Sequence, residues 1–273
     1  MKKIVLSLSL GLAFISGAYA ENRRFPTDIL HQGEVDLNAL INHQTDSYSI
    51  NSGTNSGSQS SKYTGEAVSV RYGLGSNWHI GVALSYFSQA IVATDFINPP
   101  YHFVSTSSEG RQNPSFSARY GFINDEQSSL SLSGGVNVTP NMTGHPSTYT
   151  ASLSGGWQVS KTLKLYSQLS ESTSSASNAA ASSGLNVGAY NDISENVTLI
   201  PTLGYSRSQA TNTSSSITQT SIGLSSQIQV CRNTYLIPAM SFSRHSAVDY
   251  TSGYHRDASS NGKILTLNAY HLF

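Results

Sequence analysis

Apolar and polar side chains alternate along much of this chain with a period of two residues. Residues 78–86 show the pattern most clearly. One face of this segment carries the large apolar side chains of Trp78, Ile80, Val82, Leu84 and Tyr86, and the other carries His79, Gly81, Ala83 and Ser85. Residues 115–122, 130–138 and 149–159 repeat the pattern. Such alternation is typical of β-strands with one apolar face, so the sequence predicts an all-β protein.

The connections between the alternating segments are short and long in turn. The short ones are residues 75–77, 124–127, 160–162, 191–196 and 231–233. The longer ones are rich in serine, asparagine and glycine, and they include residues 51–62, 207–216 and 246–263. Twelve strands fit between them, centred near residues 40, 68, 82, 119, 134, 154, 165, 187, 201, 223, 238 and 268. The asymmetry predicts a transmembrane, antiparallel, up-and-down β-barrel with short periplasmic turns and long extracellular loops.

A soluble β-sandwich would also alternate, because it too buries one face of each strand. Two features favour the membrane barrel. One is the final strand, in which apolar residues alternate backwards from the last residue of the sequence. Aromatic residues also sit at the ends of the apolar faces, where girdles at the two membrane interfaces would lie: Tyr72, Trp78, Tyr86, Tyr120, Phe122, Tyr149, Trp157 and Tyr205.

The first twenty residues have the layout of a signal peptide. Lys2 and Lys3 precede an apolar stretch at residues 4–15, and small residues follow at 18–20. We expect residues 1–20 to be removed during export. Residues 21–33 would then form a short periplasmic segment that could reach back into the barrel mouth, and residues 34–273 the barrel. This arrangement predicts the outer membrane of a Gram-negative bacterium as the location.

Composition excludes several classes of function. Without Lys2 and Lys3, 13 of the 15 basic residues remain against 15 acidic ones, so the exported chain has no basic surplus for nucleic acid. The single cysteine, Cys231, cannot form an intramolecular disulfide. The eight histidines are scattered and show no spacing typical of metal ligands, so we expect no metal and no cofactor.

The last residues, "LTLNAYHLF", resemble the C-terminal insertion signal of bacterial outer-membrane barrels. In that pattern a terminal phenylalanine follows apolar residues at alternate positions, here Leu265, Leu267, Ala269 and Phe273. His271 departs from it, because an apolar residue is more usual there. The resemblance implies that the barrel-assembly machinery and membrane lipid are partners of this strand.

If the apolar faces contact lipid, the opposite faces line the lumen. Candidate pore-lining residues are Asp36, Arg71, Arg119, Lys164, Tyr166 and Asn186, among many small serines, threonines and asparagines. Small side chains in a twelve-stranded ring leave room for water. The lumen is therefore either hydrated and unselective, or a pore whose few charges bias what passes. Three basic residues are too few for a strongly anion-selective pore.

The connection at residues 88–114 is unusually apolar. Ile91, Phe96, Tyr101 and Phe103 lie around the pair of prolines at 99–100. Because so apolar a loop is not normally left in water, we expect it to fold over or into the mouth as a constriction. Packing against neighbouring loops or a partner subunit is the alternative.

The sequence gives only weak support for a catalytic function. The segment "GYHRDASSNG" at 253–262 faintly resembles the His-x-Ser-Asn core of outer-membrane phospholipases and lipid A deacylases, in which a histidine activates a serine. Here His255 precedes Ser259 and Ser260 by four and five positions instead of two. We therefore expect that the protein is not an enzyme.

Two stretches, "RFPTDILHQGEVD" and "VSVRYGLGSNWHIGVALSY", resemble the outer-membrane transporters of the MetA-pathway phenol-degradation family. The resemblance spans most of the exported chain and implies a channel for small solutes, including apolar or aromatic compounds. The family also includes twelve-stranded secretion pores for functional-amyloid subunits, but the N-terminal helical plug and coiled coil of those pores are missing here. An export pore and a structural or adhesive barrel with a closed lumen are the alternatives.

Overall fold

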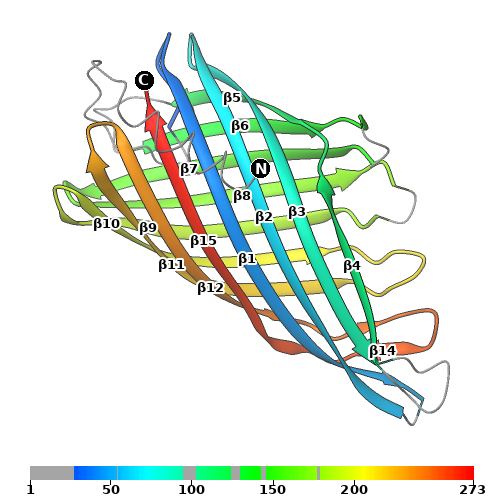
Figure 1. Cartoon of the computed structure of the whole chain (residues 1–273). Coiled ribbons are helices and arrows are strands. Elements are labelled where there is room, and N and C mark those ends of the chain that lie inside the picture. The colour runs from blue at the N-terminus through cyan, green and yellow to red at the C-terminus, as the bar shows by residue number, and fades with distance from the viewer. Residues whose placement is uncertain (1–27, 54, 95–102, 124–129, 143–145, 177–178) are drawn as a thin grey trace.

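Fifteen antiparallel strands form a single sheet within residues 28–53, 55–94, 103–123, 130–142, 146–176 and 179–273, which are the residues that the computed structural model describes (Figure 1). The strands are β1 (Val35–Ser52), β2 (Asn55–Gly75), β3 (Trp78–Thr94), β4 (Phe103–Arg111), β5 (Ser115–Ile123), β6 (Leu130–Thr139), β7 (Thr148–Ser160), β8 (Leu163–Ser174), β9 (Ser182–Ser194), β10 (Val197–Ser208), β11 (Ile217–Cys231), β12 (Thr234–His245), β13 (Val248–Asp249), β14 (Tyr254–Arg256) and β15 (Ser259–Leu272).

The sheet closes into a barrel because β1 pairs with both β2 and β15. Strands β4 and β5 occupy one position in the wall. Both pair with β3, through Tyr86↔Arg111 and Ala83↔Ser115, with a shift of one residue between them. The short strands β13 and β14 lie beyond the ends of β12 and β15. Among the described residues the wall therefore has twelve strand positions, and the predicted twelve-stranded antiparallel barrel is confirmed.

The predicted short connections are tight turns at one end of the barrel, which we call the turn end. Gly75 pairs with Trp78, so the β2–β3 turn has two central residues, Ser76 and Asn77. Both have positive φ, 49° and 64°, as a type I′ hairpin requires. The connections after β7, β9 and β11 are equally short, whereas residues 124–127 lie outside the described residues. The opposite end is called the loop end.

The predictions of two loops at the loop end are wrong for the residues that the structure describes. Residues 51–62 are almost all strand, because β1 and β2 stay paired up to Ser52↔Asn55. Residues 88–94 continue β3, and Phe103 begins β4, which pairs with it from Thr94↔Phe103 to Tyr86↔Arg111. Both the polar segment and the apolar segment form strands because a neighbouring strand supplies backbone hydrogen-bond partners along their length. As a result, β1 to β4 extend the barrel wall at the loop end (Figure 1).

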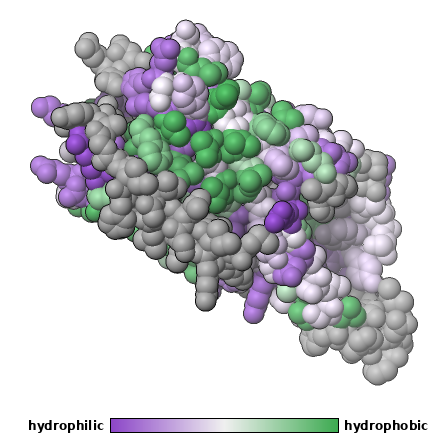
Figure 2. Space-filling view, turned by 45° about the horizontal axis from the view of Figure 1, so that its top comes forward, coloured by the Kyte–Doolittle hydropathy of each residue, from purple (hydrophilic) through white to green (hydrophobic). Residues whose placement is uncertain are grey.

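Large apolar side chains cover the outside of the wall. Leu84, Leu203 and Ile222 are 61%, 57% and 60% exposed. Figure 2 shows such residues gathered in a patch on the visible face, with hydrophilic residues around it. Aromatic rings edge the belt at the turn end, where the ring centroids of Trp78 and Tyr120 are 4.9 Å apart. An exposed apolar belt with an aromatic edge is what a lipid bilayer would cover.

The end of the chain closes the barrel. The backbone nitrogen of Phe273 donates to the carbonyl oxygen of Val35 at 2.8 Å. Leu265 and Leu267 are 53% and 46% exposed on the outer face, the face predicted for the insertion signal. Binding of the assembly machinery to this strand stays a prediction.

His271 differs from the lipid-facing position expected for it. Its side chain is only 4% exposed, its Nδ1 lies 2.7 Å from Thr234 Oγ1, and its ring packs edge-on against Phe273 at 4.3 Å. The polar residue is tolerated at this apolar position because these two neighbours cover it.

Candidate functional site

The register of the strands decides which residues line the inside of the barrel. Cross-strand partners point to the same side of a sheet. Asp36 pairs with Arg71, His79 with Arg119, and Gln158 with Lys164, all on the face opposite the exposed apolar belt. Tyr166 pairs with Gly188, and Gln168 with Asn186, on the same inner face. The six residues predicted to line a pore therefore all belong to the inner face, while a role in solute passage stays a proposal.

Residues 28–33, which we call the mouth segment, lie across the turn end of the lumen. Ile29 and Leu30 are 1% and 4% exposed, although the segment precedes the first strand. The backbone nitrogen of Leu30 donates to His79 Nδ1 at 3.4 Å. The backbone nitrogen of Gly33 donates to the carbonyl oxygen of Gly73 at 2.9 Å. Residues 28–33 thus contact the barrel at its turn end, whereas the predicted periplasmic segment of residues 21–33 as a whole stays a prediction.

Gly73 on β2 makes room for the mouth segment. A Cβ atom at this position would overlap the carbonyl oxygen of His31 and would lie 2.9 Å from that of Leu30. Only glycine lets two backbones approach so closely within a strand. The backbone nitrogen of Gly73 also donates to the carbonyl oxygen of Glu34 at 3.0 Å. Position 73 is therefore part of the site, and its signal in the sequence is an isolated glycine inside a strand.

The charges predicted in the lumen gather near the mouth segment and are paired. Lys164 Nζ donates to Asp28 Oδ1 at 3.4 Å, and the two side chains are 12% and 19% exposed. Arg71 Nη2 donates to Asp36 Oδ2 at 2.5 Å, with the Asp36 side chain fully buried. Arg119 Nη2 donates to the hydroxyl of Ser154 at 2.6 Å. Each of the two carboxylates faces a cation, so these three basic and two acidic residues together carry one net positive charge.

Tyrosine rings form a second layer of the site. Tyr166 and Tyr190 have ring centroids 5.2 Å apart and pack with Ile200 in a buried cluster. Tyr235 and Tyr270 stack at 4.7 Å, and Gln227 Nε2 donates to the Tyr270 hydroxyl at 2.8 Å. Our sequence analysis did not select Tyr190 or Tyr235. Their inner-face position within alternating strands is the signal that would have found them.

Of the four residues predicted to form a constriction loop, the structure places two in strands, and the constriction itself stays a prediction. Ile91 lies within β3, where it pairs with Thr106 of β4 and Ser61 of β2. Phe103 is the first residue of β4, and Phe96 and Tyr101 lie outside the described residues. In the part of the chain that the structure describes, the segment that narrows the barrel is the mouth segment at the turn end.

A short hairpin, β13 with β14, joins two parts of the rim at the loop end. β14 pairs with β1 through Asn51↔His255, and on the other side the backbone nitrogen of Ser215 donates to the carbonyl oxygen of Asp249 at 2.8 Å. His255 Nδ1 lies 2.6 Å from Asp249 Oδ1, and its Nε2 lies 3.2 Å from Asp257 Oδ1. Hydrogen bonding to Asp249 raises the pKa of His255 above its ordinary value.

The same contacts bear on catalysis and on metal binding. Both ring nitrogens of His255 face aspartates, so the histidine is held away from the role of a general base toward a serine. Across the described residues, no three histidine, cysteine or acidic side chains are grouped as metal ligands. The part of the chain that the structure describes also contains no helix that could cross a membrane.

Known structures identify the fold. Neither a protein-family model nor a curated protein matches this sequence. An outer-membrane channel from Pseudomonas putida F1 superimposes with a TM-score of 0.64 at 10% identity, covering 92% of this chain and 100% of that one. This protein has the fold of a bacterial outer-membrane β-barrel. The turn end accordingly corresponds to the periplasmic side.

Other solved barrels share the architecture. The β domain of a Bordetella autotransporter matches with a TM-score of 0.52 at 10% identity, covering 89% of this chain and all of that one. CymD, a monoaromatic hydrocarbon channel, matches with a TM-score of 0.50 at 8% identity, covering 89% of each chain. Proteins with such different names share this barrel, so the fold by itself does not fix the function.

Proposed function

We propose that this protein is a passive outer-membrane channel for small solutes, including apolar and aromatic compounds, whose periplasmic mouth is closed by residues 28–33. The observation that carries the proposal is how differently the mouth segment and the wall are held. The wall is a closed ladder of backbone hydrogen bonds. The contacts of the mouth segment include two buried apolar side chains, one ion pair and several backbone hydrogen bonds, and the segment is not itself a strand of the wall, so it can leave while the barrel stays intact.

The lining supports a mixed polar and aromatic path. The inner face carries hydroxyl and amide side chains along most strands, and the tyrosines near the mouth, which are buried in the closed state, would add flat aromatic rings to the path when the mouth segment leaves. Two structural neighbours, named as an outer-membrane channel and a monoaromatic hydrocarbon channel, are consistent with the proposal. The pairing of Asp36 with Arg71 and of Asp28 with Lys164 favours neutral solutes over strongly charged ones.

A closed structural barrel is the second candidate, and the burial of Ile29 and Leu30 favours it. If the mouth segment never leaves, solutes cannot cross, and the extended loop end would be the functional part. For an export pore, the described residues offer no specific argument. Catalysis is not part of either proposal, since His255 lies fixed between Asp249 and Asp257.

A reversible tether separates the two candidates. Leu30→Cys with His79→Cys, in a Cys231→Ser background, would join the mouth segment to β3 when oxidised. In planar bilayers we expect no conductance in the oxidised state and clear conductance after reduction. Liposome-swelling assays on the reduced protein would then compare benzyl alcohol with glucose.

The control is the Cys231→Ser protein alone, which should conduct equally with and without the reductant. Equal conductance of the tethered protein in both states would refute the role of the mouth segment. No conductance in either state, with the barrel folded, would favour the structural barrel.

A further inference from the structure

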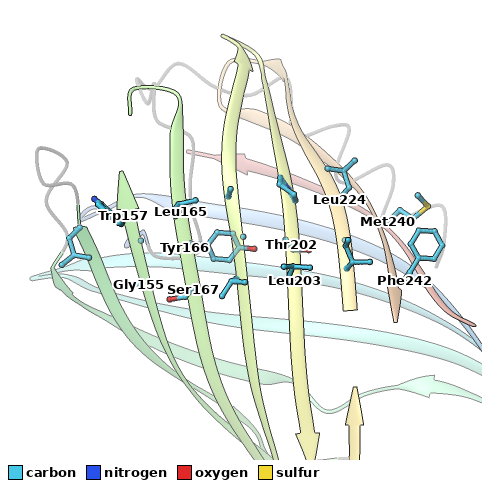
Figure 3. Close-up of a pocket in the computed structure, with 18 residues that line it drawn as sticks. Gly155, Trp157, Leu165, Tyr166, Ser167, Thr202, Leu203, Leu224, Met240 and Phe242 are labelled. Atoms are coloured by element: carbon cyan, nitrogen blue, oxygen red, sulfur yellow. The ribbon is translucent and has the colours of Figure 1, made fainter. Parts of the chain in front are cut away.

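A groove of about 980 Å³ crosses the outer wall of the barrel from β6 to β12 (Figure 3). Its lining is almost entirely apolar, and the larger side chains among those labelled in Figure 3 are Trp157, Leu165, Leu203, Leu224, Met240 and Phe242. Trp157 and Leu203 are each 57% exposed, so the groove opens away from the lumen. It opens on the side of the wall opposite the lumen, although its lining also includes Tyr166 and Gly188 of the inner face.

The groove follows a row of cross-strand partners. Each member of the row pairs with the next, in the order Gly155, Ser167, Val187, Leu203, Ile222 and Phe242. Strands lie about 4.8 Å apart, so such a row spans roughly 24 Å. One leaflet of a bilayer is only about 15 Å deep, half of the roughly 30 Å hydrocarbon core. The groove is thus long enough for an extended acyl chain.

Small residues form the floor of the groove. Gly155 and Ser167 pair with each other, and Ala189 pairs with Leu165 on the neighbouring strand. The larger side chains of Trp157 and Leu165, which also pair with each other, lie beside Gly155 and Ser167 on the same face. The depression arises because small and large side chains lie next to each other on this part of the outer face. An acyl chain in the depression would contact the protein on several sides.

Positive charge lies at the loop end of the same row. Phe242, the last lining residue, pairs with Lys263, and Arg244 follows Phe242 by two residues on the same strand and face. Both basic side chains are exposed. Their cross-strand partners toward β1 and β11 are Thr45 and Thr220, which carry no charge. An apolar groove therefore ends at two cations near the edge of the apolar belt.

We propose that this groove binds an acyl chain of a phosphorylated lipid of the outer leaflet, with the phosphate at Lys263 and Arg244. Apolar contacts hold the chain, and the charges select the headgroup, since each basic residue at a membrane surface attracts anionic lipid. A second copy of the protein fits less well, because two such faces would bring Lys263 and Arg244 close to their own copies. This assignment goes beyond the channel proposal and does not depend on it.

Native mass spectrometry of the protein in neutral detergent would test the assignment. The probes are lipid A with its phosphates and phosphatidylcholine, which has acyl chains but no net charge. Lys263→Gln with Arg244→Gln should weaken lipid A binding on the order of tenfold and leave phosphatidylcholine binding unchanged. Ala189→Phe, which fills the groove, should weaken binding of both lipids.

Two control variants match these changes elsewhere. Lys161→Gln removes a charge from the turn between β7 and β8, and Ala151→Phe enlarges an exposed residue of β7 outside the groove. Both should leave lipid binding unaltered. Lipid A binding that survives the paired glutamine substitutions, or that the controls weaken equally, would overturn the proposal. If the protein instead forms a dimer that Ala189→Phe abolishes, the groove would be assigned to contact with a second copy of the chain.

Discussion

The mouth segment should be held mainly by its two apolar side chains and only secondarily by its ion pair. Ile29→Ser should therefore raise the open probability of the channel more than removal of the whole ion pair by Asp28→Asn combined with Lys164→Met does, since the double change leaves no uncompensated charge behind. The reasoning compares two kinds of contact at one site, and it requires that residues 28–33 leave as a unit.

The magnitudes follow from the geometry. At 3.4 Å and an effective dielectric constant of about 20, the Coulomb attraction between Asp28 and Lys164 is roughly 5 kcal/mol. Most of this is cancelled by the cost of removing both charges from water, which leaves a net contribution of about 1 kcal/mol, or roughly fivefold in the open population. Burying an isoleucine side chain contributes about 2 kcal/mol, or roughly 30-fold.

Single-channel recordings in planar bilayers give the open probability directly. Lys161→Gln is the control for removing the charge of Lys164, since it removes a lysine charge from the neighbouring turn between β7 and β8. Asp28→Lys combined with Lys164→Asp should restore most of the wild-type closure, because the pair is re-formed with its signs exchanged. A larger effect of the paired Asp28→Asn and Lys164→Met changes than of Ile29→Ser would refute this ordering, and unchanged open probability in both proteins would remove the mouth segment as the gate.

Three further predictions concern other parts of the barrel. Gly73→Ala should open the channel without unfolding the wall, because its Cβ would displace the carbonyl oxygen of His31, and bilayer recordings with a urea melt would measure both. His271→Phe should lower the urea midpoint, because the buried hydroxyl of Thr234 loses its 2.7 Å partner at a cost of about 1–3 kcal/mol. His255 should stabilise the loop-end hairpin more at low pH. Because its pKa is raised in the folded state, its contribution to stability is complete below a pH of about 6.5 and is lost as the pH rises through the folded-state pKa. Hydrogen-exchange protection of the amide of Asp257, which donates to the carbonyl oxygen of Ser49 at 3.0 Å, would measure it.

Each of these has a matched comparison. Gly110→Ala should be silent, since its Cβ would meet nothing closer than 4.0 Å. Thr234→Val combined with His271→Phe should regain stability, because neither polar group is then left unpaired. His255→Gln should abolish the pH dependence of protection. A midpoint unchanged in His271→Phe, or a protection factor that stays flat with pH in the wild type, would contradict the respective argument.

The barrel itself followed from the sequence because alternation is a local property. The outward orientation of a residue such as Leu84 can be predicted from the alternation of its sequence neighbours. Cross-strand partners then share that orientation from one strand to the next around the barrel. The turn at residues 75–77 was equally local, since glycine, serine and asparagine are common turn residues, and the two-residue hairpin then places Ser76 and Asn77 at positive φ. These features require no knowledge of distant contacts.

The errors arose where distant contacts decide the structure. Residues 51–62 are rich in serine and glycine, which favour loops, yet β3 supplies a partner as far as Gln59↔Ala93 and the segment is strand. Strand propensity depends strongly on such context. The contacts of the mouth segment could not be predicted, because Asp28 and Lys164 are 136 residues apart in sequence. Only Gly73, a glycine within a strand, marked the place where another backbone approaches.

The distribution of contacts suggests where this barrel can move. Each wall strand bonds to two neighbours over much of its length, so moving one would break many hydrogen bonds together. The mouth segment has a small number of contacts, each worth about as much as a single hydrogen bond or one buried side chain. A change of state in this protein should therefore occur at residues 28–33 and leave the wall, the outer groove and the loop-end hairpin in place. Solute gating and lipid binding would then vary independently, so Ala189→Phe should leave the open probability of the channel unchanged.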